Sequence, residues 1–474
     1  RRAVAPSCGV GQDRRASDGD PMDRTESFLL TDLYQLAMME AYLANGQTDT
    51  AVFEFFVRKL PDRHGFFLAA GLEQVLAFLE DLHVPEDDLA WLRESGRFGA
   101  AFLDHLAGFR FTGDVEAMPE GTAFFPDAPI LRITAPLPEA QYVETRIINI
   151  LHYQSLVASK AARMRLAAGG ARLIDFGLRR AHGAEAGLFA ARAAYIGGFD
   201  GTATVAAARR YGVPVYGTMA HSFVQAQDTE DAAFTRFAHA RPEGLVLLID
   251  TYDTEAAARK VTALAPRLRA EGIEVQAVRL DSGDLGALAT SVRAILDGAG
   301  ETEIGIIASG GLDEDRIAGL VAAGAPIDGY GVGSSLTTCS DAPVLDCAYK
   351  LQEYAGLARR KLSAGKSTWP GRKQVWRSHD PAGTMAGDVL STAEDWQPGA
   401  PLLRPVMRGG TRCAPAEDLG AIRHRAAAEM DRLPARLRRM DAPADYTVEV
   451  ATPLRDLAEA VIHRMEAAEG RKLR

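Results

Sequence analysis

Cysteine is scarce in this sequence: the four that it contains, Cys8, Cys339, Cys347 and Cys413, lie far apart and form no CxxC pair. This usage indicates neither a zinc ribbon nor a disulfide framework. A reducing compartment is the simplest setting for such a chain, so we expect a cytoplasmic protein.

Long apolar runs and an excess of positive charge are missing as well. No run approaches the ~20 residues that a helix needs to cross a bilayer. The 53 Lys and Arg residues stand against 63 Asp and Glu, which gives a formal net charge of −10. This balance argues against general binding of nucleic acid or of an anionic membrane. An anionic ligand would therefore have to meet positive groups concentrated at one place.

The 474 residues, of which 47% are hydrophobic, suffice for two or three domains with a large core. Residues 1–24 are polar, rich in small side chains and without the apolar segment of a signal peptide, so we predict that they are disordered. Because Met22 stands just before the first patterned segment, we add the hypothesis that residues 1–21 are not native coding sequence.

The first patterned part of the chain mixes helices with antiparallel strands. Helical periodicity is found at 28–46 and 71–82, and a β-rich run at 50–61 stops at proline. Residues 111–137 have period-two stretches broken by Gly and Pro, which predicts short strands. An α+β domain is therefore expected, followed by a long helix at 139–168.

After Gly170, short apolar runs alternate with helix-like stretches. We predict strands at 171–177, 193–199, 213–222, 244–250, 274–284, 303–311 and 326–336. Strands that alternate with helices in this way are parallel, and seven such units favour an irregular (α/β) barrel. A doubly wound sheet is the competing fold, but no GxGxxG fingerprint follows the first strand.

Polar residues and glycines gather at the C-terminal ends of these runs, where barrel enzymes carry their active sites. The sixth run ends in Ser309, Gly310 and Gly311, and the seventh contains Gly331 and Gly333. Glycine lets the backbone approach an anion closely, and the last units of a barrel often bind phosphate. A turn that needs glycine would explain either loop alone, but the pair favours phosphate binding.

The fifth run ends in RLDSGDL (279–285), which places Asp281 and Asp284 around Ser282 and Gly283. Such carboxylates suit Mg²⁺, directly or through water, or the hydroxyls of a ribose. The structural alternative is an Asx turn before a helix that Asp284 caps. Both can hold, since Asp284 can cap while Asp281 faces a ligand.

Two further strand ends carry reactive residue types. In DFGLRRA (175–181), Phe176 can stack on a planar ring, and Arg179 can form a bidentate pair with a carboxylate. The alternative is that Arg179 and Arg180 only form surface ion pairs. In VPVYGTMAHSF (213–223), a strand ends near His221 and Ser222. There the alternatives are a helix cap and a reactive imidazole.

In order and spacing, the motifs TDLYQLAMM, FEFFVRKLP, DFGLRRAHG, GTMAHSF, RLDSGDL, IIASGGLDE and GVGSSL resemble those of nicotinate phosphoribosyltransferase. The later stretches GKSTWPGRKQVWR, PLLRPVM and DYTVEV agree too, so the resemblance runs from about Phe28 to the end. It implies an α/β fold in which an irregular (α/β) barrel, 141–350, lies beside an α+β domain formed from N- and C-terminal segments, 25–140 and part of 351–474. In the 365–377 stretch we interpret Lys366, Arg372 and Lys373 as a solvated loop; contact with nucleotide is the alternative.

The resemblance also implies a reaction: nicotinate and phosphoribosyl pyrophosphate, with Mg²⁺, give nicotinate mononucleotide and pyrophosphate, and ATP hydrolysis is coupled through a phosphorylated histidine. Carried over by motif, the catalytic residues are His221, Arg279 and Asp281, and Asp281 is also the candidate Mg²⁺ ligand. The residues expected to bind substrate are Tyr34, Phe176, Arg179, Thr202 and Ser222. Those expected to bind phosphate are Ser282, Gly283, Gly310, Gly311, Gly331 and Gly333. Tyr34 would reach in from a second subunit, which implies a homodimer with shared active sites.

Ala203 bears on the choice of substrate. The related nicotinamide enzymes carry an aspartate in a GTDT loop, whereas this chain reads GTAT. Aspartate would repel a carboxylate, so alanine favours nicotinate, unless Ala203 is a packing residue. The alternatives left open are a nicotinamide or quinolinate phosphoribosyltransferase, a flavin or nucleotide enzyme on another phosphate-binding barrel, and a non-catalytic metabolite-binding protein on the same fold.

Overall fold

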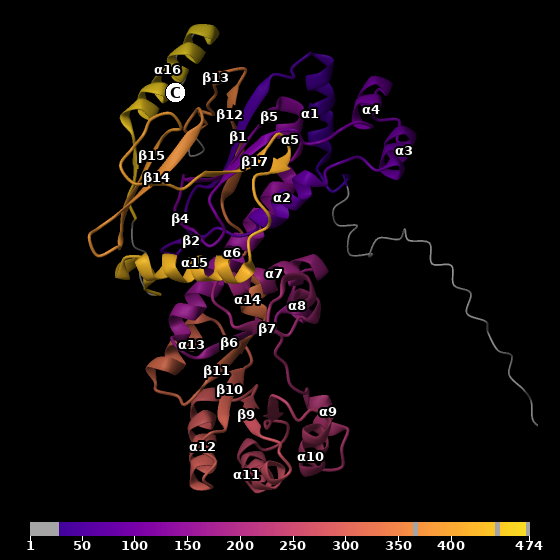
Figure 1. The fold of residues 1–474 in the computed structure, drawn as a ribbon, viewed down its shortest axis with the longest axis vertical. Helices are drawn as coiled ribbons and strands as arrows, with labels where there is room; N and C mark the ends of the chain where they lie inside the picture. The colour runs from indigo at the N-terminus through magenta and orange to yellow at the C-terminus, as the bar shows by residue number, and fades with distance from the viewer. Residues whose placement is uncertain (1–27, 364–367, 441–445, 471–474) are drawn as a thin grey trace, which may run out of the picture.

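The structure is a computed structural model that describes residues 28–363, 368–440 and 446–470 (Figure 1). The predictions for residues 1–24 and for Lys366 lie outside these ranges. Figure 1 shows two bodies along the long axis: an upper one that contains the first and the last described helices, and a lower α/β one. Across the described ranges, no helix is long and apolar enough to span a membrane.

The upper body is organised around a seven-stranded sheet in the order β13-β12-β1-β5-β3-β17-β18. Its strands are β1 (Thr50–Val57), β3 (Asp114–Ala117), β5 (Pro129–Pro136), β12 (Cys347–Tyr354), β13 (Leu357–Ala358), β17 (Arg404–Arg408) and β18 (Thr411–Arg412). The interior strand β1 is buried from its second residue to its last and pairs antiparallel with β12 and β5. Strands from both parts of the chain thus complete one sheet, which confirms the α+β domain formed from N- and C-terminal segments.

Helices and two smaller sheets complete the upper body. The helices are α1 (Leu33–Ala44), α2 (Leu72–Glu80), α3 (Glu86–Glu94), α4 (Ala100–Leu106), α5 (Leu137–Tyr142), α15 (Leu419–Arg432) and α16 (Thr452–Glu469). A two-stranded ribbon joins β2 (Phe67–Leu68) to β4 (Ala123–Phe124), and a four-stranded sheet contains β14 (Lys373–His379), β15 (Met385–Thr392), β16 (Ala400–Pro401) and β19 (Val448–Val450). The helices and the strand predicted near the N-terminus are confirmed.

The solvated loop predicted around Lys373 is wrong. Lys373 begins β14 and is buried, and its ammonium lies 2.7 Å from the Glu54 carboxylate of β1 and donates to the Trp369 carbonyl. Arg372 pairs with Glu353. A buried ammonium needs a compensating carboxylate, so these cations hold the C-terminal segment to the first sheet.

The lower body contains a six-stranded parallel sheet in the order β7-β6-β11-β10-β9-β8. Its strands are β6 (Arg172–Asp175), β7 (Gly201–Thr202), β8 (Leu245–Leu248), β9 (Val275–Leu280), β10 (Gly305–Ser309) and β11 (Gly329–Val332). The helices of this body are α7 (Ala184–Ile196), α8 (Val205–Tyr211), α9 (His221–Gln225), α10 (Glu230–Ala240), α11 (Thr254–Ala270), α12 (Leu285–Gly298), α13 (Glu314–Ala322) and α14 (Ser334–Thr338), and η2 (Leu178–Arg180) is a short 3-10 turn. The curled sheet confirms an irregular, half-open barrel.

Two of the seven predicted strands differ from the structure. Residues 193–199 are the end of α7 and the turn after it, because the apolar residues there continue the buried face of that helix. The strand follows as the short β7. In 213–222 only Val215 bridges to the sheet, opposite Thr202, next to a proline that has no N–H to donate. The sheet therefore stays open between β7 and β8.

Helix α6 (Glu144–Ala168) links the two bodies, and the long helix predicted at 139–168 is present as α5 followed by α6. Most of α6 is buried, including hydroxyls that accept from the upper body: Ser159 from the Leu68 amide at 2.9 Å and Ser155 from the Ala70 amide at 3.2 Å. A second link is the buried ion pair between Arg192 of α7 and Glu120, with a distance of 2.6 Å.

We expect Glu120→Gln to lower the free energy of unfolding by about 3–5 kcal/mol, because Arg192 would stay buried without its carboxylate. Urea denaturation followed by circular dichroism measures this. The matched control is Glu86→Gln, whose carboxylate pairs with Arg93 but is 82% exposed, and which should cost less than about 1 kcal/mol. Equal effects of the two substitutions would contradict the assignment of Glu120 and Arg192 as a structural link.

Candidate functional site

His221 stands at the start of α9 with its ring toward the ends of neighbouring strands. The N-cap of α9 is Ala220 and no side chain caps the helix, so the cap alternative for His221 and Ser222 is wrong. The Nδ1 atom of His221 lies 3.2 Å from the Thr251 hydroxyl. Its Nε2 atom lies 3.8 Å from Oδ2 of Asp281 and 4.0 Å from Oδ1 of Asp250. The side chain is 38% exposed, so a ligand can reach the imidazole between these two carboxylates.

Arg279 and Asp281, at the end of β9, form one hydrogen-bonded unit. The Arg279 guanidinium donates to the Asp281 carboxylate at 2.8 Å and to the Ser309 hydroxyl at 2.9 Å, and Ser309 also donates to Asp281. Burial alone would raise the pKa of Asp281, but the hydrogen bonds from Ser309 and Arg279 outweigh it and hold the pKa below its usual value. Asp281 is therefore ionised at neutral pH.

Asp250 is a further candidate site residue, to which the sequence patterns gave no role. It follows β8, and its side chain is only 2% exposed. One oxygen accepts from the Asp281 amide at 3.1 Å and from the Ser282 hydroxyl, while Oδ1 has no hydrogen-bond partner among the described residues and faces His221. Its position at the end of a parallel strand was the signal that could have identified it.

The loop after β6 forms a platform. The Phe176 ring lies directly over Gly331, where an added Cβ would sit 2.3 Å from a ring carbon, and the Arg279 guanidinium lies 5.4 Å from the ring centroid. Asp175 accepts from the Gly177 amide and from the Thr202 hydroxyl, each at 2.7 Å. Burial raises the pKa of Asp175. Thr202 is fully buried, so it supports this loop and its hydroxyl is already used.

Three other predicted substrate residues are exposed. Arg179, in η2, makes no ion pair within the described part of the chain, so the surface ion-pair alternative does not hold there. Ser222 is exposed beside His221. Tyr34 lies on α1 in the upper body and makes no ring contact with Phe176 among the residues that the structure describes. The single chain thus brings together the lower-body residues but not Tyr34.

The glycine loops divide into two roles. Gly310 has a positive φ of 93°, and a Cβ there would stand 2.0 Å from the Asp281 carbonyl; Gly310 and Gly311 are both exposed. Gly333 precedes α14, next to the Phe176 backbone. Gly331, by contrast, is buried in β11 under the Phe176 ring. The first three can offer backbone amides to an anion, whereas Gly331 makes room for the platform.

The predicted helix cap is present, since Asp284 accepts from the Ala287 amide at the start of α12 while Asp281 turns toward His221. Ser282 and Gly283 lie exposed between them, with Ser282 bonded to Asp250. No group of three or more His, Cys, Asp or Glu side chains in the described ranges could hold a metal ion. The two carboxylates of Asp250 and Asp281 fit Mg²⁺, which keeps several waters and shares its remaining positions with substrate phosphates.

Comparison with known proteins agrees with this geometry. Family models described as the N-terminal domain, the family and the C-terminal domain of nicotinate phosphoribosyltransferase match residues 29–152, 171–357 and 399–458. The chain belongs to the nicotinate phosphoribosyltransferase family. A relative from Mycobacterium tuberculosis, nicotinate phosphoribosyltransferase pncB2, is 49% identical over 93% of this chain and 95% of its own length.

Two solved structures share the fold. That of human nicotinic acid phosphoribosyltransferase covers 91% of this chain and 99% of its own, with a TM-score of 0.81 and 31% identity. That of a nicotinate-nucleotide pyrophosphorylase from Pyrococcus furiosus covers 89% of this chain, with a TM-score of 0.71 and 25% identity. The barrel and its flanking domain therefore occur together in both proteins.

We expect Gly331→Ala to displace the Phe176 ring and to destabilise the protein by about 1–3 kcal/mol, because the added methyl group overlaps the ring. Urea denaturation measures the loss, and a crystal structure of the variant measures the ring. Gly319→Ala is the control: it lies inside α13 with open space around it, so it should be neutral or stabilise by up to ~1 kcal/mol. An unmoved ring in Gly331→Ala would disprove the packing role.

Proposed function

We propose that this protein transfers the phosphoribosyl group from phosphoribosyl pyrophosphate to nicotinate, giving nicotinate mononucleotide and pyrophosphate. The observation that carries the proposal is the arrangement, after the parallel strands, of an aromatic platform at Phe176, an exposed arginine three residues further on, and a histidine between two carboxylates. Each of these groups suits a different part of the two substrates.

The ring of nicotinate stacks on Phe176, and its carboxylate pairs with Arg179, which is exposed and has no carboxylate partner among the described residues. Ala203 supports this choice. It follows β7, is exposed and is tied to the Asp175 carbonyl through its amide, so it is not a packing residue. With no acidic side chain at this place, a carboxylate substrate meets no repulsion, which favours nicotinate over nicotinamide.

The phosphoribosyl part lies over the glycine loops, where the amides around Gly310, Gly311 and Gly333 point at the 5′-phosphate. The ribosyl carbon gains positive charge as pyrophosphate leaves, and ionised Asp281 stabilises it. Arg279 offsets the charge of the leaving group. Asp250 and Asp281 would hold Mg²⁺, which when bound neutralises part of the negative charge on pyrophosphate.

ATP is a co-substrate: Nε2 of His221 forms a bond to the γ-phosphorus as the bond to the ADP oxygen breaks, and ADP leaves. The hydrogen bond between Nδ1 and Thr251 orients the ring so that Nε2 faces Asp250 and Asp281. The carboxylates 3.8 Å and 4.0 Å from Nε2 are too distant to block it by a hydrogen bond but near enough to stabilise positive charge on the ring.

We further infer a cytoplasmic homodimer with shared active sites. The start of α1 exposes Leu33 and Tyr34, with Leu30 just before it, and a cluster of exposed apolar side chains favours a partner surface. Tyr34 of a second subunit would cover the free face of the nicotinate ring. A reducing compartment is supported by Cys339, Cys347 and Cys413, which are all free thiols; burial raises the pKa of the Cys339 thiol to about 12, so it is unreactive.

The reaction is tested by turnover of nicotinate, nicotinamide and quinolinate with phosphoribosyl pyrophosphate and Mg²⁺, each with and without ATP. We expect product from nicotinate only, stimulated by ATP, and we expect His221→Ala to lose the stimulation but keep basal transfer. Binding of nicotinate without turnover would favour a metabolite-binding protein. Product from nicotinamide or quinolinate would mean that the Arg179 pocket has been assigned to the wrong substrate.

Shared active sites are tested by mixing two inactive variants, Tyr34→Ala and Phe176→Ala. Each heterodimer would contain one site with both aromatic residues intact, so refolding an equal mixture should restore roughly a quarter of wild-type activity. A mixture of each variant with itself is the control. No recovery in the mixture, despite heterodimers detected by mass spectrometry, would place both residues in the same subunit's site.

A further inference from the structure

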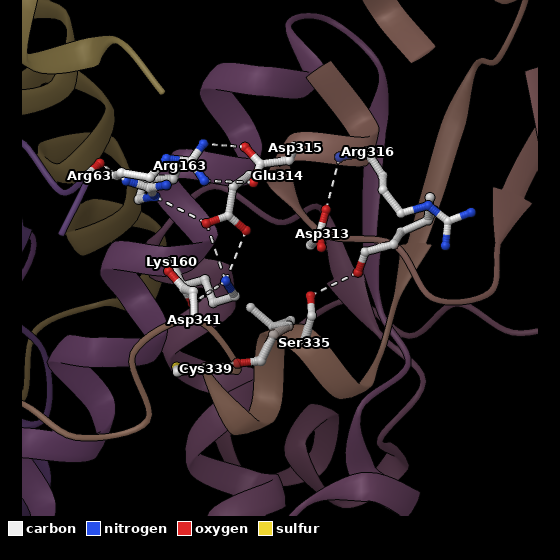
Figure 2. Close-up of polar contacts among 12 residues, drawn as sticks. Arg63, Lys160, Arg163, Asp313, Glu314, Asp315, Arg316, Ser335, Cys339 and Asp341 are labelled. Atoms are coloured by element: carbon white, nitrogen blue, oxygen red, sulfur yellow. Dashed lines mark hydrogen bonds and ion pairs between the residues drawn. The ribbon is translucent and has the colours of Figure 1, made fainter. Parts of the chain in front are cut away.

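Lys160 is a charged residue in the middle of the buried helix α6, and its side chain is only 1% exposed. Figure 2 shows its ammonium between two carboxylates that come from different parts of the lower body. It donates to both oxygens of Glu314, at 2.9 Å and 3.2 Å, and to Asp341. No step of the proposed reaction uses this lysine.

The two carboxylates flank the glycine loops. Glu314 is the first residue of α13, three positions after Gly311, and Asp341 lies three positions after the end of α14, the helix that Gly333 precedes. The loops also contact each other directly, since the Ser335 hydroxyl donates to the Leu312 carbonyl at 2.8 Å. Lys160 therefore joins the ends of two segments whose other ends form the candidate phosphate site.

Glu314 and Asp341, the two partners of Lys160, differ in their other contacts and in their exposure. Glu314 is buried and also accepts from Arg163 of α6 at 3.1 Å. Asp341 is 36% exposed, pairs otherwise with His64 at 2.9 Å, and adjoins a cavity of about 360 Å³. Arg63 pairs with Asp315 at the rim. Without the lysine, Glu314 would keep a cation and stay in place, whereas Asp341 would have both space and solvent to move into.

We propose that Lys160 is a positioning residue for the substrate phosphate, because its ammonium fixes the spacing of the loops at 310–313 and 333–341. This rests on the proposed function, in which these loops hold the 5′-phosphate of phosphoribosyl pyrophosphate. Loop amides that bind phosphate act only at hydrogen-bond distance, so a small shift of one loop against the other weakens binding of this substrate.

The protonation state of Lys160 supports the same role. Burial favours the neutral amine, but the charges of Glu314 and Asp341 outweigh it and raise the pKa of Lys160 above its usual value. The ammonium is therefore charged at neutral pH. Two carboxylates on separate loops would repel each other without it.

Lys160→Met removes the charge and keeps the length of the side chain. We expect the KM for phosphoribosyl pyrophosphate to rise on the order of tenfold, with the KM for nicotinate changed less than about twofold. Inorganic phosphate, used as a competitive probe, should lose affinity in the same proportion. The matched control is Lys260→Met, whose ammonium pairs with Glu230 on α10 while remaining 37% exposed, and which should leave all three values unchanged.

If Lys160→Met does not fold, Asp341→Asn tests the contact between Lys160 and Asp341 from the exposed partner. We expect the same selective rise in the KM for phosphoribosyl pyrophosphate. Equal changes in both KM values, or a loss confined to kcat, in the variant that folds would overturn the positioning role. The wild-type reaction is measured first: if phosphoribosyl pyrophosphate and nicotinate give no product, the proposed function has failed. The positioning role of Lys160 is contradicted only if the wild-type enzyme is active and the variants show no selective rise in the KM for phosphoribosyl pyrophosphate.

Discussion

The structure depends on one buried helix that carries charge. Helix α6 crosses from the upper to the lower body, and an all-apolar helix could fill this space by packing alone. Instead, Ser155 and Ser159 accept from backbone amides of the upper body, and Lys160 and Arg163 pair with Glu314 of the lower body. Buried polar groups are costly unless each has its partner, so these contacts allow one arrangement of the two bodies and penalise others.

The candidate site uses the same principle on a smaller scale. Asp250, Arg279 and Asp281 stand at the ends of adjacent parallel strands, and each is bonded to the next through backbone or side chain. Because the strands fix the spacing of these groups, the charges of the candidate site are in place before any ligand arrives. Groups that are fixed in place in this way stabilise charge that develops during a reaction, because they need not reorganise.

Much of this architecture could be predicted from local patterns, and the exceptions have physical causes. Alternating runs identified five of the barrel strands. Residues 193–199 were apolar enough for either a strand or the end of a helix, and they form the end of α7 because their apolar side chains continue its buried face. Lys373 was predicted to be solvated because local sequence does not show which carboxylate pairs with a basic residue. Its partner, Glu54, is more than 300 residues away in sequence.

The candidate site residues also differ in how far local sequence patterns reveal them. Phe176 and Asp281 could be chosen as candidates because motif and strand end coincide, whereas His221 follows only an isolated bridge at Val215 and was chosen from its motif. Asp250 stands at a strand end too, but its role appears only when the open oxygen is seen to face His221. The role of Gly331 depends on a ring from another strand, which is a contact that no local pattern contains.

The gap between β7 and β8 has a consequence for motion. The segment that leads to His221 is tied to the sheet by two backbone hydrogen bonds between Thr202 and residues 214–216, by the Thr218 hydroxyl on the Val246 carbonyl, and by Arg279, which donates to the Met219 carbonyl at 3.4 Å. Asp281 and the glycine loops, in contrast, continue from paired strands. A change of charge on the imidazole can thus be accommodated by a local hinge, at the expense of few bonds, while the ring platform and the phosphate loops keep their register.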